Sequence, residues 1–88
     1  MTDVGLRPRV FETLANLLPE VLRRDLAAPT DATRLADLDV GSADMLALVL
    51  RLEDELEIQV DVEEFDEADG ETLGALADFI ARHSVSFA

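Results

Sequence analysis

The side chains of this sequence that could carry out catalysis are one histidine, three serines and twenty acidic residues. Ser42 lies in the run Val40-Gly41-Ser42-Ala43, which lacks the Gly-x-Ser-x-Gly turn that exposes a hydrolase nucleophile. His83 falls at the end of a predicted helix, where a cation also suits the helix dipole. The sequence therefore predicts no catalytic residue, and we do not expect an enzyme.

A metal site is the next chemistry to consider, because residues 66–71 contain the acids and glycine of a calcium-binding loop. Placing Gly70 at the sixth loop position puts Phe65 at the first ligand position and Leu76 at the twelfth, and neither side chain can bind calcium. The absence of cysteine excludes a thiolate site and a disulfide scaffold. The sequence thus predicts no metal site.

Ser42 differs from the other two serines in its position. Ser84 and Ser86 lie in a tail that we expect to fray. Ser42 follows the longest predicted loop and precedes the most apolar predicted helix. It could be only the N-cap of that helix, or its hydroxyl could be exposed for modification. Composition and periodicity do not decide between these two interpretations.

The elements that must position Ser42 follow from helical periodicity. A first apolar stripe is formed by Val10, Leu14, Leu17, Leu18 and Val21. It predicts a helix that starts near Pro8 and runs to Leu18. Pro19 should end or kink this helix, which leaves residues 20–24 as an irregular turn or a continuation past a kink.

Residues 27–40 read as a loop of unusual length for a small domain, and such loops are usually functional. Leu35 and Leu38 could hold this loop against the core. Gly41-Ser42 then opens the second helix, with Asp44 in its first turn. From Met45 to Leu52 the sequence is apolar around most of the helix circumference, which predicts packing on more than one side. We therefore assign Leu46, Val49 and Leu50 to the core.

The last third of the chain predicts a short element over residues 63–68, with Phe65 as its anchor, and then a turn at Asp69-Gly70. Thr72 should cap a final helix, whose buried face comprises Leu73, Leu76, Ala77, Phe79 and Ile80. The β-like run at residues 57–62 is short, and residues 1–7 and 84–88 are expected to fray. The prediction is an all-α fold with three main helices and one short helix, in a single domain over residues 1–88.

Composition limits the possible partners. The chain has 88 residues, 49% of them hydrophobic, and a net charge of −13. Nucleic acid is excluded as a partner because phosphate contacts need Lys and Arg, and an acidic membrane surface would repel the chain. No secretory or membrane-spanning run is present in the sequence. We expect a cytoplasmic monomer whose partners carry basic surfaces.

A resemblance becomes clear around Ser42. Residues 35–44, Leu-Ala-Asp-Leu-Asp-Val-Gly-Ser-Ala-Asp, resemble the stretch around the modified serine of acyl carrier proteins. Residues 48–56 are similar to the family's second helix, and Val60 with Glu63 and Glu64 resembles the entry to its short third helix. Thr72-Leu73 and Phe79-Ile80 are similar to its last helix. The resemblance covers residues 9–83.

This resemblance implies a small acyl-carrier-like four-helix bundle in which Ser42 receives 4′-phosphopantetheine from coenzyme A. The thiol of that group would carry acyl or polyketide intermediates as thioesters between enzymes of a fatty-acid, polyketide or lipopeptide pathway. The implied partners are a phosphopantetheinyl transferase and acyl-activating, acyltransferase, ketosynthase or synthetase enzymes with basic docking surfaces. The expected docking residues are Asp39, Gly41, Ala43, Asp44, Met45, Glu53, Asp54 and Glu55.

The sequence departs from the family pattern beside the serine. Gly41 stands where the family has Asp, and Ala43 stands where it has Leu. Both neighbours normally help the modifying transferase. Ala47 and Arg51 also make the second helix less uniformly acidic than is usual in the family. Two alternatives stay open, an aminoacyl or peptidyl carrier of nonribosomal peptide synthesis, and an unmodified, carrier-like acidic docking module.

Overall fold

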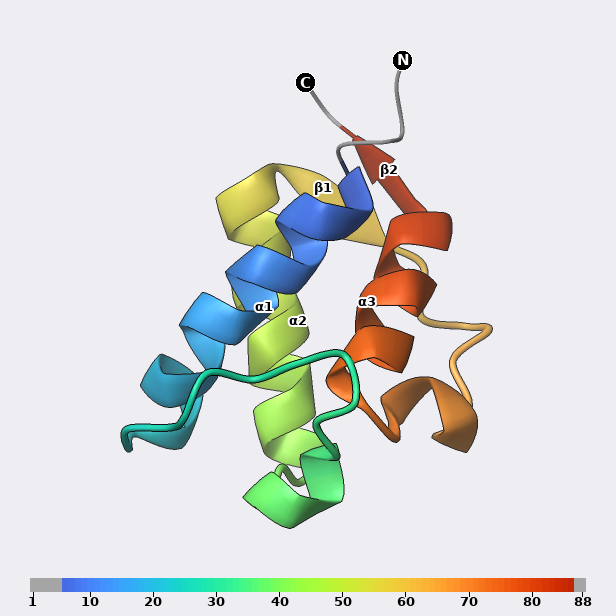
Figure 1. Cartoon of the computed structure of the whole chain (residues 1–88). Helices are drawn as coiled ribbons and strands as arrows, with labels where there is room; N and C mark the ends of the chain where they lie inside the picture. Colours follow the sequence, from blue (N-terminus) through green and yellow to red (C-terminus); the bar gives the residue numbers. More distant parts are fainter. Residues whose placement is uncertain (1–5, 87–88) are drawn as a thin grey trace.

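The fold is a small helical bundle, seen in a computed structural model that describes residues 6–86. In chain order the elements are α1 (Leu6–Leu22), η2 (Leu35–Leu38), α2 (Ser42–Leu56), β1 (Ile58–Val60), η3 (Glu67–Gly70), α3 (Leu73–Arg82) and β2 (Ser84–Ser86). The three α-helices pack together, η2 lies with the start of α2 at one end, and the β1–β2 ribbon lies at the other (Figure 1). The predicted all-α bundle is confirmed, with two 3-10 turns and a small ribbon added to its three helices.

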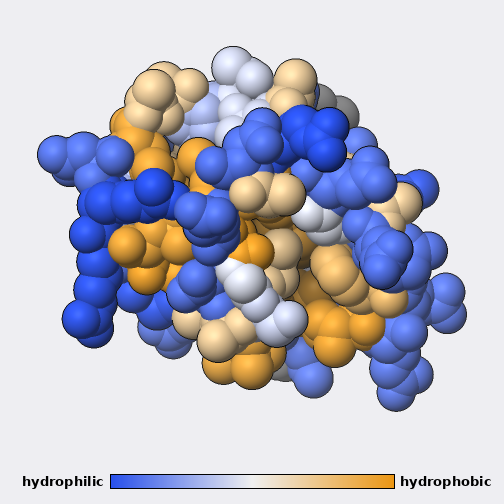
Figure 2. All heavy atoms as spheres, turned by 90° about the horizontal axis from the view of Figure 1, so that it is seen from below, coloured by the Kyte–Doolittle hydropathy of each residue, from blue (hydrophilic) through white to orange (hydrophobic). Residues whose placement is uncertain are grey.

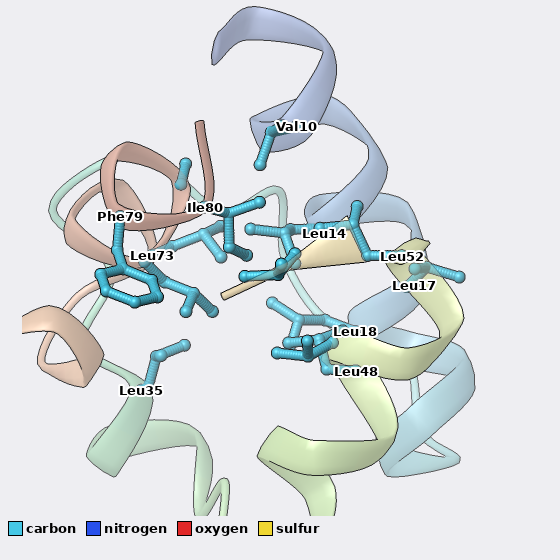
Figure 3. Close-up of a cluster of buried hydrophobic side chains, with 14 of the residues drawn as sticks. Val10, Leu14, Leu17, Leu18, Leu35, Leu48, Leu52, Leu73, Phe79 and Ile80 are labelled. Atoms are coloured by element: carbon cyan, nitrogen blue, oxygen red, sulfur yellow. The ribbon is translucent and has the colours of Figure 1, made fainter. Parts of the chain in front are cut away.

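One hydrophobic core joins all three α-helices. Its fully buried side chains include Val10, Leu14 and Leu18 of α1, Leu48 and Leu52 of α2, and Leu73, Leu76, Phe79 and Ile80 of α3. Figure 3 labels all of these except Leu76 and shows them gathered between the helices, with Leu35 reaching from η2 toward the cluster. Leu35 is 1% exposed, and Leu38 packs against the edge of the core. The expectation that this pair holds the loop to the core is confirmed.

Helix α1 is longer than the sequence predicts. It begins at Leu6 and runs without interruption to Leu22, so the predicted end at Leu18 is wrong and the alternative of a continuation past Pro19 is confirmed. Pro8 lies in the first turn, where its missing N–H has no intrahelical partner to lose. Pro19 forfeits one backbone hydrogen bond inside the helix, but Val21 and Leu22 beyond it still pack against the core. That burial outweighs the single lost hydrogen bond.

The start of α1 is fixed by an arginine that the sequence analysis assigned to a frayed segment. The Arg7 guanidinium donates to Asp78 Oδ1 at 2.7 Å, to Asp31 Oδ1 at 3.3 Å and to the Gly74 carbonyl at 3.3 Å. The hydrogen bond that Arg7 donates to Asp78 is the main cause that raises the Arg7 pKa above its ordinary value. Arg7 thus joins α1, α3 and the long loop. Residues 1–5 of the predicted frayed segment lie outside the described residues.

The long loop between α1 and α2 is held against the start of α3. The Leu35 N–H donates to the Glu71 carbonyl at 3.0 Å, and Arg34 forms an isolated β-bridge with Thr72. In the reverse direction, the Leu73 N–H donates to the Thr33 carbonyl at 2.9 Å. The loop also contains the turn η2, so the predicted structureless segment is partly ordered by its own hydrogen bonds.

The C-terminal segment forms a strand. β1 and β2 pair antiparallel, with Gln59 opposite Val85, and the Asp61 N–H donates to the His83 carbonyl at 2.7 Å. The prediction that residues 84–86 fray is therefore wrong, because pairing with the β-like run satisfies their backbone groups. Residues 87–88 lie outside the described residues.

The short element of the last third lies later than the sequence predicts. It is the 3-10 turn η3 and begins after Asp66, whose side chain accepts from the Ala68 N–H at 3.0 Å. The predicted turn at Asp69-Gly70 belongs to this same element. Phe65 precedes it and contacts Phe79 edge-to-face, with ring centroids 5.2 Å apart. The predicted anchor is therefore present, whereas the predicted boundaries of the element are wrong.

Candidate functional site

Ser42 is the first residue of α2 and is exposed. The N-cap position belongs to Gly41, which has no side chain to cap the helix, so the interpretation of Ser42 as the N-cap is wrong. In its place, the Asp44 carboxylate accepts from the Gly41 N–H at 3.5 Å, near the limit for a hydrogen bond. The hydroxyl of Ser42 is thus not used to cap its helix.

The backbone at this helix start also has unused donors. The first helical hydrogen bond runs from the Met45 N–H to the Gly41 carbonyl at 2.9 Å. Within residues 6–86, no acceptor faces the N–H groups of Ser42, Ala43 and Asp44. These groups carry the positive end of the helix dipole. The start of α2 can therefore accept an anionic group attached to Ser42 Oγ.

An apolar groove of about 490 Å³ opens beside Ser42. One wall is formed by Met45, Leu46 and Val49 of α2, and the other by Val62, Phe65 and Gly70. Figure 2 looks onto this end of the molecule and shows hydrophobic patches among surrounding hydrophilic residues. A Cβ added to Gly70 would meet Phe65 Cζ at 3.1 Å, so glycine keeps the Phe65 ring close to the chain here.

The outer face of α2 departs from the prediction of a helix packed on several sides. Val49 is buried, as expected, but Leu46 is 61% exposed and Leu50 is 55% exposed. Their assignment to the core is therefore wrong. Helix α2 packs against α1 and β1, and these two leucines lie one turn apart on a face left open to solvent.

The predicted docking residues fall into two groups. Asp39, Gly41, Ala43, Asp44 and Met45 lie at the Ser42 end, where Asp39 is exposed and takes a left-handed conformation with φ of 59°. Glu53, Asp54 and Glu55 lie about 16 Å farther along the helix. Asp54 and Glu55 are exposed, whereas the Glu53 carboxylate accepts from the Val60 N–H at 2.8 Å. That contact gives Glu53 a structural role in holding β1.

Sequence reasoning missed the second wall of the groove. Val62, Glu67 and Gly70 belong to it, and Val62 is 55% exposed. The available signal was charge, because twelve acidic residues and no basic residue lie between Arg51 and Arg82. The second wall of the groove therefore belongs to an acidic stretch of the chain, and Glu67 of this stretch lines the groove itself.

The acidic run shows no sign of a metal site. Within the described part of the chain, no three His, Cys, Asp or Glu residues form a group that could hold a metal ion. In the run that resembles a calcium loop, the Asp66 and Asp69 carboxylates accept backbone N–H groups within η3. None of the helices in residues 6–86 is long and apolar enough to cross a membrane.

Comparison with known proteins gives one family and one relative. The family described as "Phosphopantetheine attachment site" matches residues 12–80. The non-reducing polyketide synthase VdtA of Byssochlamys spectabilis is 39% identical over 57 residues, which is 65% of this chain and 2% of the relative. The chain thus spans about 2% of the length of that relative. No solved structure gives a significant match.

The family match takes in the whole of α2, η3 and most of α1 and α3, and thus includes the helix that begins at Ser42. The match agrees with the exposed helix start at Ser42, because members of this family are carrier domains. This chain belongs to the phosphopantetheine attachment site family, whose carrier domains hold 4′-phosphopantetheine covalently.

Proposed function

We propose that this chain is an acyl carrier protein in which Ser42 bears the 4′-phosphopantetheine group. When bound, that group supplies a thiol that carries acyl or polyketide intermediates as thioesters. The similarity to a region of a polyketide synthase favours a polyketide pathway over a fatty-acid or lipopeptide pathway. The chain would work as a cytoplasmic monomer, and the chemistry would belong to its partner enzymes.

The observation that carries this proposal is the exposed Ser42 hydroxyl at an open helix start. In the attachment reaction, Ser42 Oγ would form a phosphodiester bond with coenzyme A's β-phosphorus, releasing adenosine bisphosphate and passing the hydroxyl proton to the transferase. The free N–H groups of Ser42, Ala43 and Asp44 can then face the phosphate. This end of α2 therefore fits the group.

The groove supports the same proposal from the other side of Ser42. It begins at Val40 and Ser42 and continues along Met45 and Leu46. An apolar surface next to the attachment point lowers the cost of exposing an apolar substrate to water. Met45, a predicted docking residue whose side chain lines the groove, would then contact the cargo.

Charge supports the proposed partners, a phosphopantetheinyl transferase and acyltransferase, ketosynthase or synthetase enzymes. The exposed Leu46 and Leu50 offer apolar contact area on α2. The acidic wall beside them attracts basic surfaces and speeds encounter without adding much to affinity. Fast, reversible docking is what a carrier that visits several enzymes needs.

The unmodified docking module remains the alternative because of Gly41 and Ala43. Gly41 has φ of −88° and ψ of −178°, a conformation open to any residue. A Cβ added there would meet nothing within 4 Å. The backbone thus has no need of glycine at this position, so its presence favours a change in partner recognition over a change in fold.

The deciding experiment is the intact mass after incubation with coenzyme A and a broad-specificity phosphopantetheinyl transferase. We expect the wild-type protein to gain one phosphopantetheine group. Ser42→Ala should gain none, while the matched control Ser84→Ala should be modified like the wild type. If the folded wild-type protein gains no mass with several transferases, the carrier proposal is wrong and the docking module takes its place.

A second experiment measures how much Gly41 and Ala43, the two departures from the family pattern, slow the modification of Ser42. Gly41→Asp and Ala43→Leu restore the family's residues at two exposed positions, and a Cβ at Gly41 would meet nothing within 4 Å. We expect the double variant to be modified faster than the wild type by the same transferase. Equal rates of modification for the double variant and the wild type would show that Gly41 and Ala43 do not affect recognition by the transferase.

Loading with acyl-coenzyme A analogues and aminoacyl analogues would then separate an acyl carrier from an aminoacyl carrier.

A further inference from the structure

Residues 35–41, which lead into Ser42, are held to the rest of the fold unevenly. The first part of η2 is held firmly, because Leu35 is buried and its N–H donates to the Glu71 carbonyl at 3.0 Å. The later part, residues 36–41, is mostly exposed. Its own hydrogen bonds are local, such as that from the Val40 N–H to the Leu35 carbonyl at 3.2 Å.

Arg24 supplies the link that this later part lacks. Its guanidinium donates to the Leu38 carbonyl, four residues before Ser42. Within the described residues, and apart from the two bonds between Gly41 and the first turn of α2, this is the hydrogen bond that joins residues 36–41 to another element of the fold. The remaining anchors of this segment are the partly buried side chains of Leu38 and Val40.

The position of this bond matters because the backbone conformation of the next residue, Asp39, costs free energy. Asp39 lies directly after the Leu38 carbonyl and has φ of 59° and ψ of 38°, in the left-handed region that only a few residue types tolerate. If Asp39 left this region, the chain would enter α2 from a different direction. A donor that fixes the Leu38 carbonyl therefore helps to hold the turn that places Ser42.

Arg24 is itself held by a rigid helix end. Its N–H donates to the Pro19 carbonyl at 3.2 Å, and Arg23 before it has φ of 60°. This is the Schellman arrangement, which ends a helix with one left-handed residue. The end of α1 thus directs the Arg24 side chain toward η2, and the two helices are connected through the turn that precedes Ser42.

From this geometry we infer that Arg24 is a positioning residue for the modification of Ser42. This inference rests on the proposed function. Without the bond from Arg24, the conformation of residues 36–41 that a transferase recognises is less populated. The apparent dissociation constant is inversely proportional to the competent fraction, so it rises as that fraction falls, while the bound complex is unchanged. The expected signature is a raised KM for the carrier with kcat nearly constant.

The experiment compares Arg24→Met with Arg23→Met, which removes the same charge from the neighbouring residue and keeps a similar stem. Steady-state kinetics of phosphopantetheine transfer should show KM raised about fivefold by Arg24→Met, the effect expected from losing one exposed hydrogen bond of ordinary strength. Arg23→Met should stay close to the wild type. Arg24→Lys, which keeps a charged donor, should recover part of the loss.

Amide hydrogen exchange separates positioning from general stability. Arg24→Met should speed exchange in residues 36–41 and leave the amides of α3 unchanged. Equal KM values for the two Met variants would overturn the inference, as would faster exchange throughout the molecule. A folded wild-type protein that is not modified at all would instead refute the proposed function, and the role of Arg24 in modification with it.

Discussion

The starts of α2 and α3 make an instructive comparison, because both helices leave a loop at the same end of the molecule (Figure 1). At α3 the Thr72 hydroxyl accepts from the Ala75 N–H at 3.0 Å, and the Gly74 N–H donates to the Asp31 carbonyl at 3.0 Å. The Leu73 N–H is taken by Thr33. Each early donor of α3 thus has a partner supplied by its own cap or by the long loop.

The start of α2 is arranged in the opposite way. Its cap residue is Gly41, and the N–H groups of Ser42, Ala43 and Asp44 face no acceptor within residues 6–86. A helix end whose donors are already paired contributes to stability, whereas one whose donors are free can bind an anion. The difference separates a start that supports the fold from a start that is available for function.

The prediction with the largest expected effect places the same substitution, glycine to alanine, at the start of α3 and at the start of α2. A Cβ at Gly74 would lie 2.8 Å from the Asp31 carbonyl oxygen, whereas one at Gly41 would meet nothing within 4 Å. Gly74→Ala should therefore lower the free energy of unfolding by about 1–3 kcal/mol, although alanine is the better helix former. Gly41→Ala should lower it by only about 0.5 kcal/mol, because alanine is a poorer N-cap than glycine but meets no neighbour there.

Urea denaturation of both variants measures these changes directly. Similar stability of Gly74→Ala and the wild type would mean that the loop moves away from α3 easily. The long loop would then not hold the start of α3 as firmly as the comparison of the two helix starts requires.

The second test removes the hydroxyls. Thr72→Ala deletes an N-cap and should cost about 1 kcal/mol, which lowers Tm by about 4–8 °C in a domain of this size. Ser42→Ala should cost clearly less, because Ser42 lies one residue inside its helix and does not cap it. Thermal unfolding of the two variants, side by side, provides the measurement. Equal losses would indicate that Ser42 does cap α2 in solution.

Thr72 and Ser42 also show what the sequence could and could not predict. The cap at Thr72 and the buried face of α3 follow from local patterns, a hydroxyl residue before a regular apolar stripe, and the structure confirms both. The start of α2 is also predicted to within one residue. That single residue matters, because it separates a capping hydroxyl from one that is free to be modified.

The features that the sequence did not predict depend on contacts between distant segments. Pairing of Ile58–Val60 with Ser84–Ser86 turns an expected frayed end into a strand. Leu46 and Leu50 look like core residues in a helical pattern, and only the packing of α2 against α1 and β1 leaves them exposed. Local periodicity cannot tell which apolar face the rest of the chain will cover.

The smallest test asks whether the free donors of α2 respond to charge. Ser42→Asp places a carboxylate at the first helical position, while the matched variant Ser42→Asn is nearly the same size and neutral. Interaction with the helix dipole should make the Asp variant more stable than the Asn variant by about 0.3–1 kcal/mol at low ionic strength. In about 1 M salt the difference should largely disappear, because screening then acts within about 3 Å.

Repulsion from the neighbouring acids opposes this effect, so its sign is informative. Asp39 is exposed and Asp44 half-buried, and both lie within three residues of Ser42. If the Asp variant is the less stable of the pair at low salt, their repulsion exceeds the attraction of the free N–H groups. An attached phosphate would then be repelled as well, and the transferase, instead of the start of α2, would have to supply the cation that stabilises it during transfer. If the Asp variant is the more stable, the helix start itself favours the anionic product.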